Sequence, residues 1–451
     1  MDRRRLLATA GSAFTMSVAG CARPQRAFVP GRIDRLGHTL PDEKPAFTFG
    51  HVSADGEWGV MGSFPTSESS VASTLFDLSS LDDPRVVHQL ESADAETRTN
   101  DVKFDALREG LYYRSQETNG NGQEGFEVVD FGWDAGSPGN PRVLAAFEAP
   151  NTGVHKLTTH PDAPLVYVVD TDATSEPGVI TVDVSEPNAP EVVDSVGPAG
   201  FCHDVEYDAE RAVLHAAYIL GPAEGYVIYD ASDPRSLEVL GHFEYADEPD
   251  YAELGTPGFE RCHQAHVDSE RDIAIIGDEV QSGVPGGKHL FDIGWRDGSL
   301  EDPQPIGFTH SPDAREMGDG ESFWWTTHFH DVVYDRETVL LVDGGYRQGA
   351  WVCNITDPER PTPTERYATV DGFDFEADER AGPYASTPPF AWGAVYNDER
   401  EFVFVTDSVT GAYTFEVTAD PARGENGRGP DGHYDKDQVL GDTAGGDPHD
   451  H

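Results

Sequence analysis

The chain has 451 residues, of which 37% are hydrophobic, and with 47 glycines and 32 prolines it is long enough for one large domain or two smaller ones rich in turns. Its 82 acidic residues outnumber 31 lysines and arginines, giving a formal net charge of −51. A field this negative repels phosphates and anionic lipid surfaces, which argues against direct binding of nucleic acid or of a membrane surface. The acidic residues are spread along the whole chain, as expected for a surface adapted to molar salt, where the Debye length is about 3 Å.

The N-terminal segment 1–20 is expected to be an export signal. Arg3 and Arg4 lie in a positively charged start that resembles a twin-arginine signal, and a short apolar stretch follows. The sequence Val18-Ala19-Gly20-Cys21 resembles a lipobox, which implies a lipid on Cys21. We therefore expect an extracytoplasmic protein anchored to the outer face of the cell membrane, with residues 21–29 as a tether. No later segment reaches about 18 consecutive apolar residues.

A repeated pattern fills residues 30–421. Strand-like segments end in Asp or Asn and run into a Ser/Thr–Asp/Glu–Pro turn, as in Thr181–Pro187, Val227–Pro234 and Val352–Pro358. This pattern resembles the LVIVD-repeat family of β-propellers, in its haloarchaeal-type exported lipoprotein form. The resemblance covers nearly the whole mature chain and implies a propeller.

A second pattern opens each repeat, with copies at Asn100–Asp105, His203–Asp208, His330–Asp335 and Trp392–Asn397 and weaker copies at Gly50, His155 and His263. The copies are spaced by roughly 50 to 67 residues, enough for four short strands each. The last repeat lacks a fourth strand, whereas Pro30–Gly37 matches the fourth-strand segment Pro190–Gly197. The sequence therefore predicts an all-β, seven-bladed propeller closed by an N-terminal strand that completes the last blade. Residues 422–451 are expected to be a disordered acidic tail.

The opening position of each repeat is expected to line the mouth of the central channel. Histidine occupies it in four consecutive repeats, and two further histidines lie nearby; the predicted metal ligands are His155, His203, His263, His330, His328 and His266. Imidazole and carboxylate side chains that converge on one mouth are typical of zinc, copper, iron or manganese sites. The predicted neighbours in the pocket or behind the ligands are Asn100, Asp170, Asp278, Asp343, Asp407 and Trp392. A metal-free polar pocket and a purely structural ring of histidines remain alternatives.

Cys202 and Cys262 precede two of these histidines, and adjacent strand residues point to opposite sides, so buried apolar thiols are expected rather than metal ligands. Three long segments, 244–262, 308–327 and 372–391, carry many aromatic residues and are expected either to cover the mouth or to pack on each other.

Three functions remain open from the sequence. The first is non-catalytic binding of a metal ion or a small ligand at the channel mouth. The second is a metal-dependent oxidoreductase, because the His-Asp-Val opening loosely resembles the selenium-binding-protein and methanethiol-oxidase propellers, whose metal is bound by histidine. The third is a scaffold for protein partners in the cell envelope.

Overall fold

The computed structural model describes residues 29–94, 96–118, 122–149, 153–172, 178–244, 261–268, 270–280, 286–313, 325–375 and 387–419. These residues form strands and turns and no helix, so the fold is all-β. No helix in the described part of the chain is long and apolar enough to cross a membrane. The expected signal, Cys21 with most of the tether, and the acidic tail lie outside the described residues.

Most strands form antiparallel meanders of neighbours in the chain. Five sheets contain β2 (Ala46–Val52), β3 (Trp58–Phe64), β4 (Val71–Asp77) and β5 (Arg85–Glu91); β6 (Thr97–Arg98), β7 (Val102–Phe104), β8 (Leu111–Thr118), β9 (Gly125–Asp130) and β10 (Arg142–Phe147); β11 (Leu157–Thr159), β12 (Leu165–Val169), β13 (Val179–Asp183) and β14 (Glu191–Val196); β15 (Phe201–Asp208), β16 (Val213–Leu220), β17 (Gly225–Asp230) and β18 (Glu238–Phe243); and β19 (Cys262–Asp268), β20 (Ile273–Asp278), β21 (Lys288–Asp292) and β22 (Gln304–Thr309).

An eight-stranded sheet contains the remaining strands, β23 (Phe329–Asp335), β24 (Thr338–Gly345), β25 (Gly349–Asn354), β26 (Thr362–Tyr367), β27 (Ala391–Asn397), β28 (Phe402–Asp407), β29 (Gly411–Ala419) and β1 (Gly31–Thr39). Its two four-stranded meanders meet through the parallel pairing of Phe329 with Gly393 and the isolated antiparallel bridge between Tyr346 and Phe390. A Cβ atom on Gly393 would lie 2.7 Å from the Phe49 ring, so the close approach there requires glycine.

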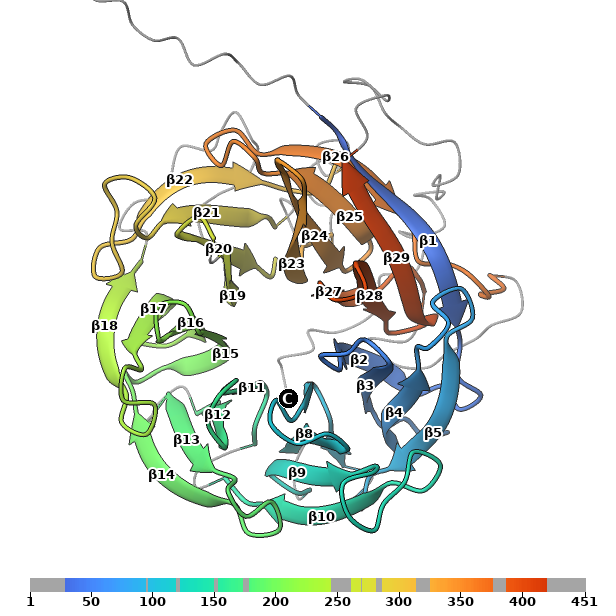
Figure 1. The fold of residues 1–451 in the computed structure, drawn as a ribbon. Helices are drawn as coiled ribbons and strands as arrows, with labels where there is room; N and C mark the ends of the chain where they lie inside the picture. The colour runs from blue at the N-terminus through green and yellow to red at the C-terminus, as the bar shows by residue number, and fades with distance from the viewer. Residues whose placement is uncertain are drawn as a thin grey trace, which may run out of the picture.

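The sheets are arranged in a ring, which makes the fold propeller-like (Figure 1). Strands β2, β11, β15, β19, β23 and β27 face the central channel (Figure 1). We call them the inner strands and count β7, which pairs with β8 in the second meander, among them. The middle strands are buried on both faces; β12, with sequence Leu-Val-Tyr-Val-Val, is buried at every position. The last strands consist mostly of exposed and half-buried residues because they form the rim of the ring.

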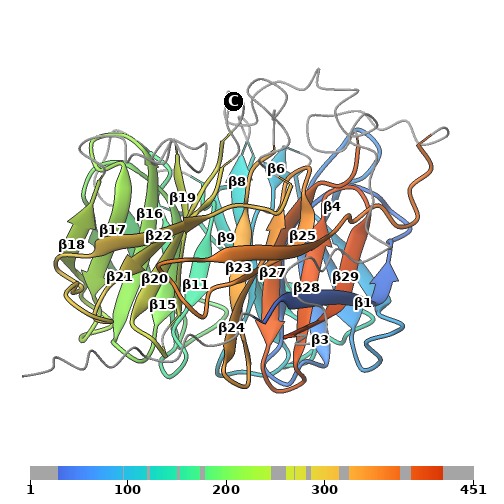
Figure 2. The same cartoon turned by 90° about the horizontal axis from the view of Figure 1, so that it is seen from above.

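The chain ends join in one sheet. β1 pairs antiparallel with β29, with Ile33 opposite Val417 and Thr39 opposite Ala412. Figures 1 and 2 both place β1 beside β29 at the outer edge of the ring. Ile33 is buried among Val352, Val403 and their neighbours. This is the pairing that the sequence predicts for the Pro30–Gly37 segment, and it covers the edge that β29 would otherwise expose.

The predicted turn chemistry is confirmed. Asp183 Oδ1 accepts the Ser185 N–H at 2.7 Å, Asp230 Oδ1 accepts the Ser232 N–H at 2.8 Å, and Asn354 Oδ1 accepts the Thr356 N–H at 2.9 Å. Each turn thus satisfies a backbone donor with the side chain two residues earlier.

Arginines that follow the inner strands tie one meander to the next, which the sequence patterns do not reveal. Arg108 donates to Val184 O at 2.6 Å and Arg271 to Ile355 O at 2.8 Å. Arg400, near the end of the chain, donates to Leu78 O at 2.7 Å. The last contact links the C-terminal meander to the N-terminal one and so supports a closed ring.

Candidate functional site

β-bulges at the start of three inner strands determine which side chains face the channel. The pairing of β15 with β16 skips His203, that of β19 with β20 skips His263, and that of β27 with β28 skips Trp392. An inserted residue breaks the alternation of the strand and turns its side chain to a new direction. Each of these three residues lines a cavity in the channel.

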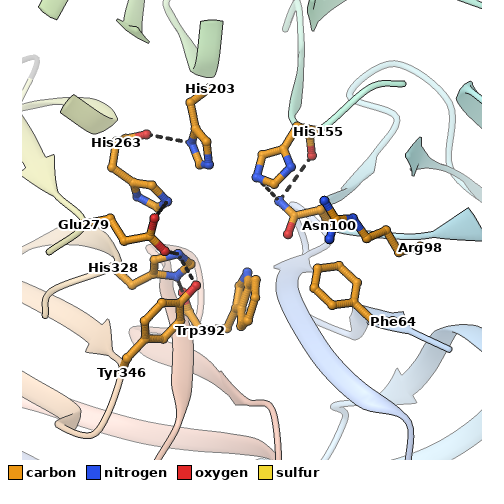
Figure 3. Close-up of a pocket in the computed structure, with 10 residues that line it drawn as sticks. All are labelled: Phe64, Arg98, Asn100, His155, His203, His263, Glu279, His328, Tyr346 and Trp392. Atoms are coloured by element: carbon orange, nitrogen blue, oxygen red, sulfur yellow. Dashed lines mark hydrogen bonds and ion pairs between the residues drawn. The ribbon is translucent and has the colours of Figure 1, made fainter. Parts of the chain in front are cut away.

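The cavity is walled by ten side chains, most of them polar: Phe64, Arg98, Asn100, His155, His203, His263, Glu279, His328, Tyr346 and Trp392 (Figure 3). Four imidazoles follow one another along the wall. Ring centroids lie 4.3 Å apart for His155 and His203, 4.0 Å for His203 and His263, and 4.5 Å for His263 and His328. The space that they enclose has a volume of about 10 Å³ for a water-sized sphere, which is room for about one water molecule.

Hydrogen bonds to the next inner strand hold these side chains in a fixed orientation. Asn100 Nδ2 donates to His155 O at 3.3 Å, His203 Nδ1 to His263 O at 2.9 Å, and His328 Nδ1 to Trp392 O. A carbonyl oxygen only accepts, so Nδ1 of His203 and of His328 carries the proton and Nε2 carries the lone pair. A hydrogen bond of this kind from one ring nitrogen is how metal-binding histidines are commonly oriented.

His155 is oriented by a carboxylate instead of a carbonyl. Its Nδ1 lies 2.8 Å from Glu117 Oε2, and its Nε2 accepts from Asn100 Nδ2 at 3.0 Å. Glu117 also binds Arg98 at 3.0 and 3.1 Å. The buried Arg98 and His155 hold the pKa of Glu117 well below its usual range despite the desolvation that opposes this. Glu117 is therefore ionised and fixes His155 as a hydrogen-bond donor at Nδ1.

Three of the wall residues have the composition and spacing of a candidate metal-ligand set. The ligand atoms of His263, Glu279 and His328 all lie within 4.8 Å of one another, and all three side chains are buried. Glu279 lies 3.8 Å from His263 Nε2 and 3.9 Å from His328 Nε2. Burial lowers the pKa of His328 to about 3, so the imidazole is neutral at physiological pH. Two imidazoles and one carboxylate are a donor set that zinc, iron and manganese accept.

Tyr346 completes this side of the cavity. Its hydroxyl lies 2.8 Å from His328 Nε2 and donates to that lone pair. A metal ion bound at His328 Nε2 would replace this hydrogen bond and leave the Tyr346 hydroxyl beside the ion. The Phe390 ring stacks on Tyr346 with a centroid distance of 4.3 Å and holds the phenol in place.

The structure brings together four of the six predicted ligands, His155, His203, His263 and His328, together with the predicted neighbours Asn100 and Trp392. His330 and His266 do not line this cavity. His330 Nδ1 lies 2.5 Å from Gln264 Oε1, and His266 Nε2 lies 3.3 Å from Asp331 Oδ1.

The displacement of His330 follows from the register between inner strands. Asp101 accepts the N–H of Leu157 at 3.0 Å, and Asp204 accepts that of Ala265 at 3.1 Å; both donors lie two residues after a cavity histidine. The corresponding side chain on β19, Gln264, accepts the His330 N–H at 3.1 Å. The cavity position of the β23 segment is therefore His328, two residues before the His-Asp-Val motif.

The four predicted carboxylates make other contacts. Asp278 binds His289 at 2.8 Å, Asp343 binds Lys288 at 2.8 Å, and Asp407 accepts from Thr369 and from the Phe390 N–H, both at 2.6 Å. Asp170 Oδ1 accepts the Asp172 N–H at 2.9 Å. None of the four lines the cavity among the described residues.

The sequence patterns miss Glu279, Glu117, Tyr346, Arg98 and Phe64. The first two have a recoverable signal. Glu279 directly follows Asp278, and adjacent residues of an extended chain point to opposite sides. Because Asp278 binds His289 outside the channel, Glu279 points into the channel. Glu117 lies near the end of β8, at the same edge as the cavity residues.

The cysteines lie away from the metal-ligand set. Cys202 and Cys262 are fully buried in two apolar clusters, and burial raises the pKa of both thiols. Cys353 is also buried and reduced. Of the predicted loop aromatics, Trp325 and Phe390 are buried and Phe375 is exposed, whereas Tyr245, Tyr251, Phe259, Phe323, Trp324 and Tyr384 lie outside the described residues.

Comparisons with known proteins support the fold and leave the function open. No family model and no curated protein matches this sequence. Among solved structures, a "putative 6-phosphogluconolactonase" from Bacteroides uniformis aligns with a TM-score of 0.51 and 12% identity, over 72% of this chain and 86% of that chain. A protein from Lactobacillus plantarum aligns with a TM-score of 0.50 and 13% identity, over 80% of this chain and 98% of that chain. At such identities the similarity shows the fold alone.

Proposed function

We propose that this protein binds one divalent transition-metal ion in the channel through His263, Glu279 and His328, with His203 beside them. The observation that carries the proposal is that the ligand atoms of these three buried side chains lie within 4.8 Å of one another. The small volume of the cavity, about 10 Å³, favours an ion over an organic ligand. Binding without turnover is the function that these contacts support most directly.

The donor set narrows the choice of metal. It contains nitrogen and oxygen only, and the thiols of Cys202 and Cys262 lie in apolar clusters elsewhere. Zinc, iron, manganese and copper(II) accept imidazole and carboxylate, whereas copper(I) prefers sulfur. A metal-dependent oxidoreductase is the second candidate, favoured by the Tyr346 hydroxyl that lies 2.8 Å from His328 Nε2, where it would face a bound ion.

The architecture that we infer is a seven-bladed propeller. The inner strands give seven meanders when β27, β28, β29 and β1 count as one blade and β23 to β26 as another. Only two backbone pairs among the described residues join these two meanders, Phe329 with Gly393 and Tyr346 with Phe390, which supports their separation. The pairing of β1 with β29 supports closure of the ring. The repeat pattern is in turn the reason for the proposed relationship to LVIVD-repeat propellers.

We also propose that the propeller is exported and held at the outer face of the cell membrane by a lipid on Cys21. The support is the sequence alone: the arginine pair, the lipobox-like segment and the acidic composition. Washing membranes with high salt should leave the protein bound. Release of the protein by salt, or retention of the Cys21→Ser variant on membranes, would contradict the anchor.

Metal content after purification tests the proposed site. Wild-type protein loaded with zinc and dialysed should retain about one ion per chain, and His263→Ala and Glu279→Gln should lose it. His330→Asn is the matched control, since this buried histidine lies outside the cavity and its loss should leave the metal bound. Retention of metal by both cavity variants, or equal loss from His330→Asn, would reject the assignment.

A further inference from the structure

Asn100 is held in one orientation in the cavity wall. It is fully buried, and its Nδ2 donates to His155 Nε2 at 3.0 Å and to His155 O at 3.3 Å. The carbonyl oxygen of His155 only accepts, so the NH₂ group of Asn100 must face it. The amide oxygen is therefore turned the other way, and Figure 3 shows it on the side of the open space.

The Asn100 oxygen needs a hydrogen-bond donor from a ligand. Oδ1 is buried and has no donor among the described residues. Buried acceptors in folded proteins are nearly always satisfied, because desolvation without a hydrogen bond is unfavourable. The ligand that satisfies Oδ1 must carry an O–H or N–H group and must fit a space of about 10 Å³. Water is the ligand that meets both conditions.

The metal-ligand set lines the same cavity as Asn100. His263, Glu279 and His328 supply three ligands, and a tetrahedral ion with three protein ligands retains a position for water.

We propose that the bound metal keeps an exchangeable water molecule and that this water donates a hydrogen bond to Asn100 Oδ1. This inference rests on the proposed metal site and specifies water as the exogenous ligand of the metal. An open coordination position of this kind is the arrangement of metal sites that activate water for hydrolysis or hydration.

Water-proton relaxation of the manganese(II)-loaded protein tests the first part of this proposal. An exchangeable water on the ion should raise the relaxation rate well above that of the zinc-loaded protein, and added azide should reduce it by displacing the water. A bound manganese ion whose relaxation effect does not respond to azide would overturn the proposal. Protein that binds no metal at all would instead refute the proposed function itself.

The role of Asn100 is tested by Asn100→Leu in cobalt(II)-loaded protein, with azide affinity read from the visible spectrum. The variant should bind azide about tenfold more tightly, because loss of the carbonyl oxygen removes the hydrogen bond that holds the water. Cobalt content should stay near one per chain. Asn397→Leu is the control, because its Nδ2 binds Ser53 O at 3.2 Å outside the cavity. Equal azide affinity in wild type and Asn100→Leu would overturn the assignment of Asn100.

Discussion

Lys288 and Asp343 form a fully buried ion pair, with Nζ 2.8 Å from Oδ2, and together they hold the backbone of His328. Asp343 Oδ1 accepts the His328 N–H at 3.3 Å, and Lys288 donates to His328 O. β-bulges turn the side chains of His203 and His263 into the cavity. His328, in contrast, precedes β23, and the pairing of β23 with β24 contains no bulge. The ion pair therefore positions His328, whereas β15 and β19 position their histidines with a bulge.

The first prediction concerns this pair. Lys288→Met should lower the free energy of unfolding by about 3–5 kcal/mol, because it leaves the Asp343 carboxylate buried without its cation. The double variant Lys288→Met/Asp343→Leu should regain much of that stability and still bind zinc at least about tenfold more weakly, since His328 is no longer held. Denaturant unfolding and metal competition measure the two effects separately.

Arg235→Ala provides the control for the ion-pair variants. Arg235 binds Asp183 at 2.6 Å at the surface, with side-chain exposures of 49% and 21%, and its loss should cost less than about 1 kcal/mol. A double variant with wild-type zinc affinity would show that the pair has no positioning role.

The second prediction concerns closure of the ring. Ile33→Ala should lower the free energy of unfolding by about 2–4 kcal/mol, because Ile33 is 4% exposed in an apolar cluster formed by residues of β23 to β25 and of β27 to β29. Leu36→Ala on the same strand is the control, since Leu36 is 38% exposed and should change stability by less than about 0.5 kcal/mol. Urea unfolding compares the two, and equal effects would mean that β1 adds little to the fold.

The third prediction is a loss of stability at alkaline pH that depends on His266. A hydrogen bond and ion pair with Asp331, together with the charges of Glu206 and Asp204, outweigh desolvation and raise the pKa of His266 to about 9. A pKa raised on folding stabilises the protein fully below the unfolded value near 6.5, and this stability is lost as pH rises through 9.

Wild-type stability should therefore fall by about 2 kcal/mol between pH 7 and pH 10 through this group. His266→Gln should be less stable at pH 7 and should lack this part of the slope. Thermal or urea unfolding at a series of pH values in constant salt measures it. A His266→Gln profile parallel to that of the wild type would contradict the assignment.

The fourth prediction separates the thiols from the metal site. Cys202, Cys262 and Cys353 are all buried, with thiol pKa values raised by burial, so the folded protein should react with a thiol reagent far more slowly than the unfolded protein. Cys202→Ala/Cys262→Ala should keep its zinc, because neither sulfur lies in the ligand set. Loss of zinc from this double variant would place sulfur among the ligands.

The sequence by itself determined the strands, their turns and the pairing of the chain ends. Alternation with period two and the Asp-Ser-Pro turns are local signals, and the match of Pro30–Gly37 to a fourth strand reflects repetition along the chain. The same repetition located His155, His203 and His263, because three neighbouring inner strands keep one register at the cavity.

Only the tertiary structure decided which residues complete the site. A shift of two residues preserves the inward and outward alternation of a strand, so the sequence pattern cannot distinguish His328 from His330, whereas the contact of Gln264 with the His330 N–H does. Glu279 rather than Asp278 enters the cavity because Asp278 finds His289 on the neighbouring strand β21. Local patterns determine which face of a strand is apolar. The depth at which a side chain lies along the channel depends on contacts between strands about 60 residues apart, and no local pattern encodes those contacts.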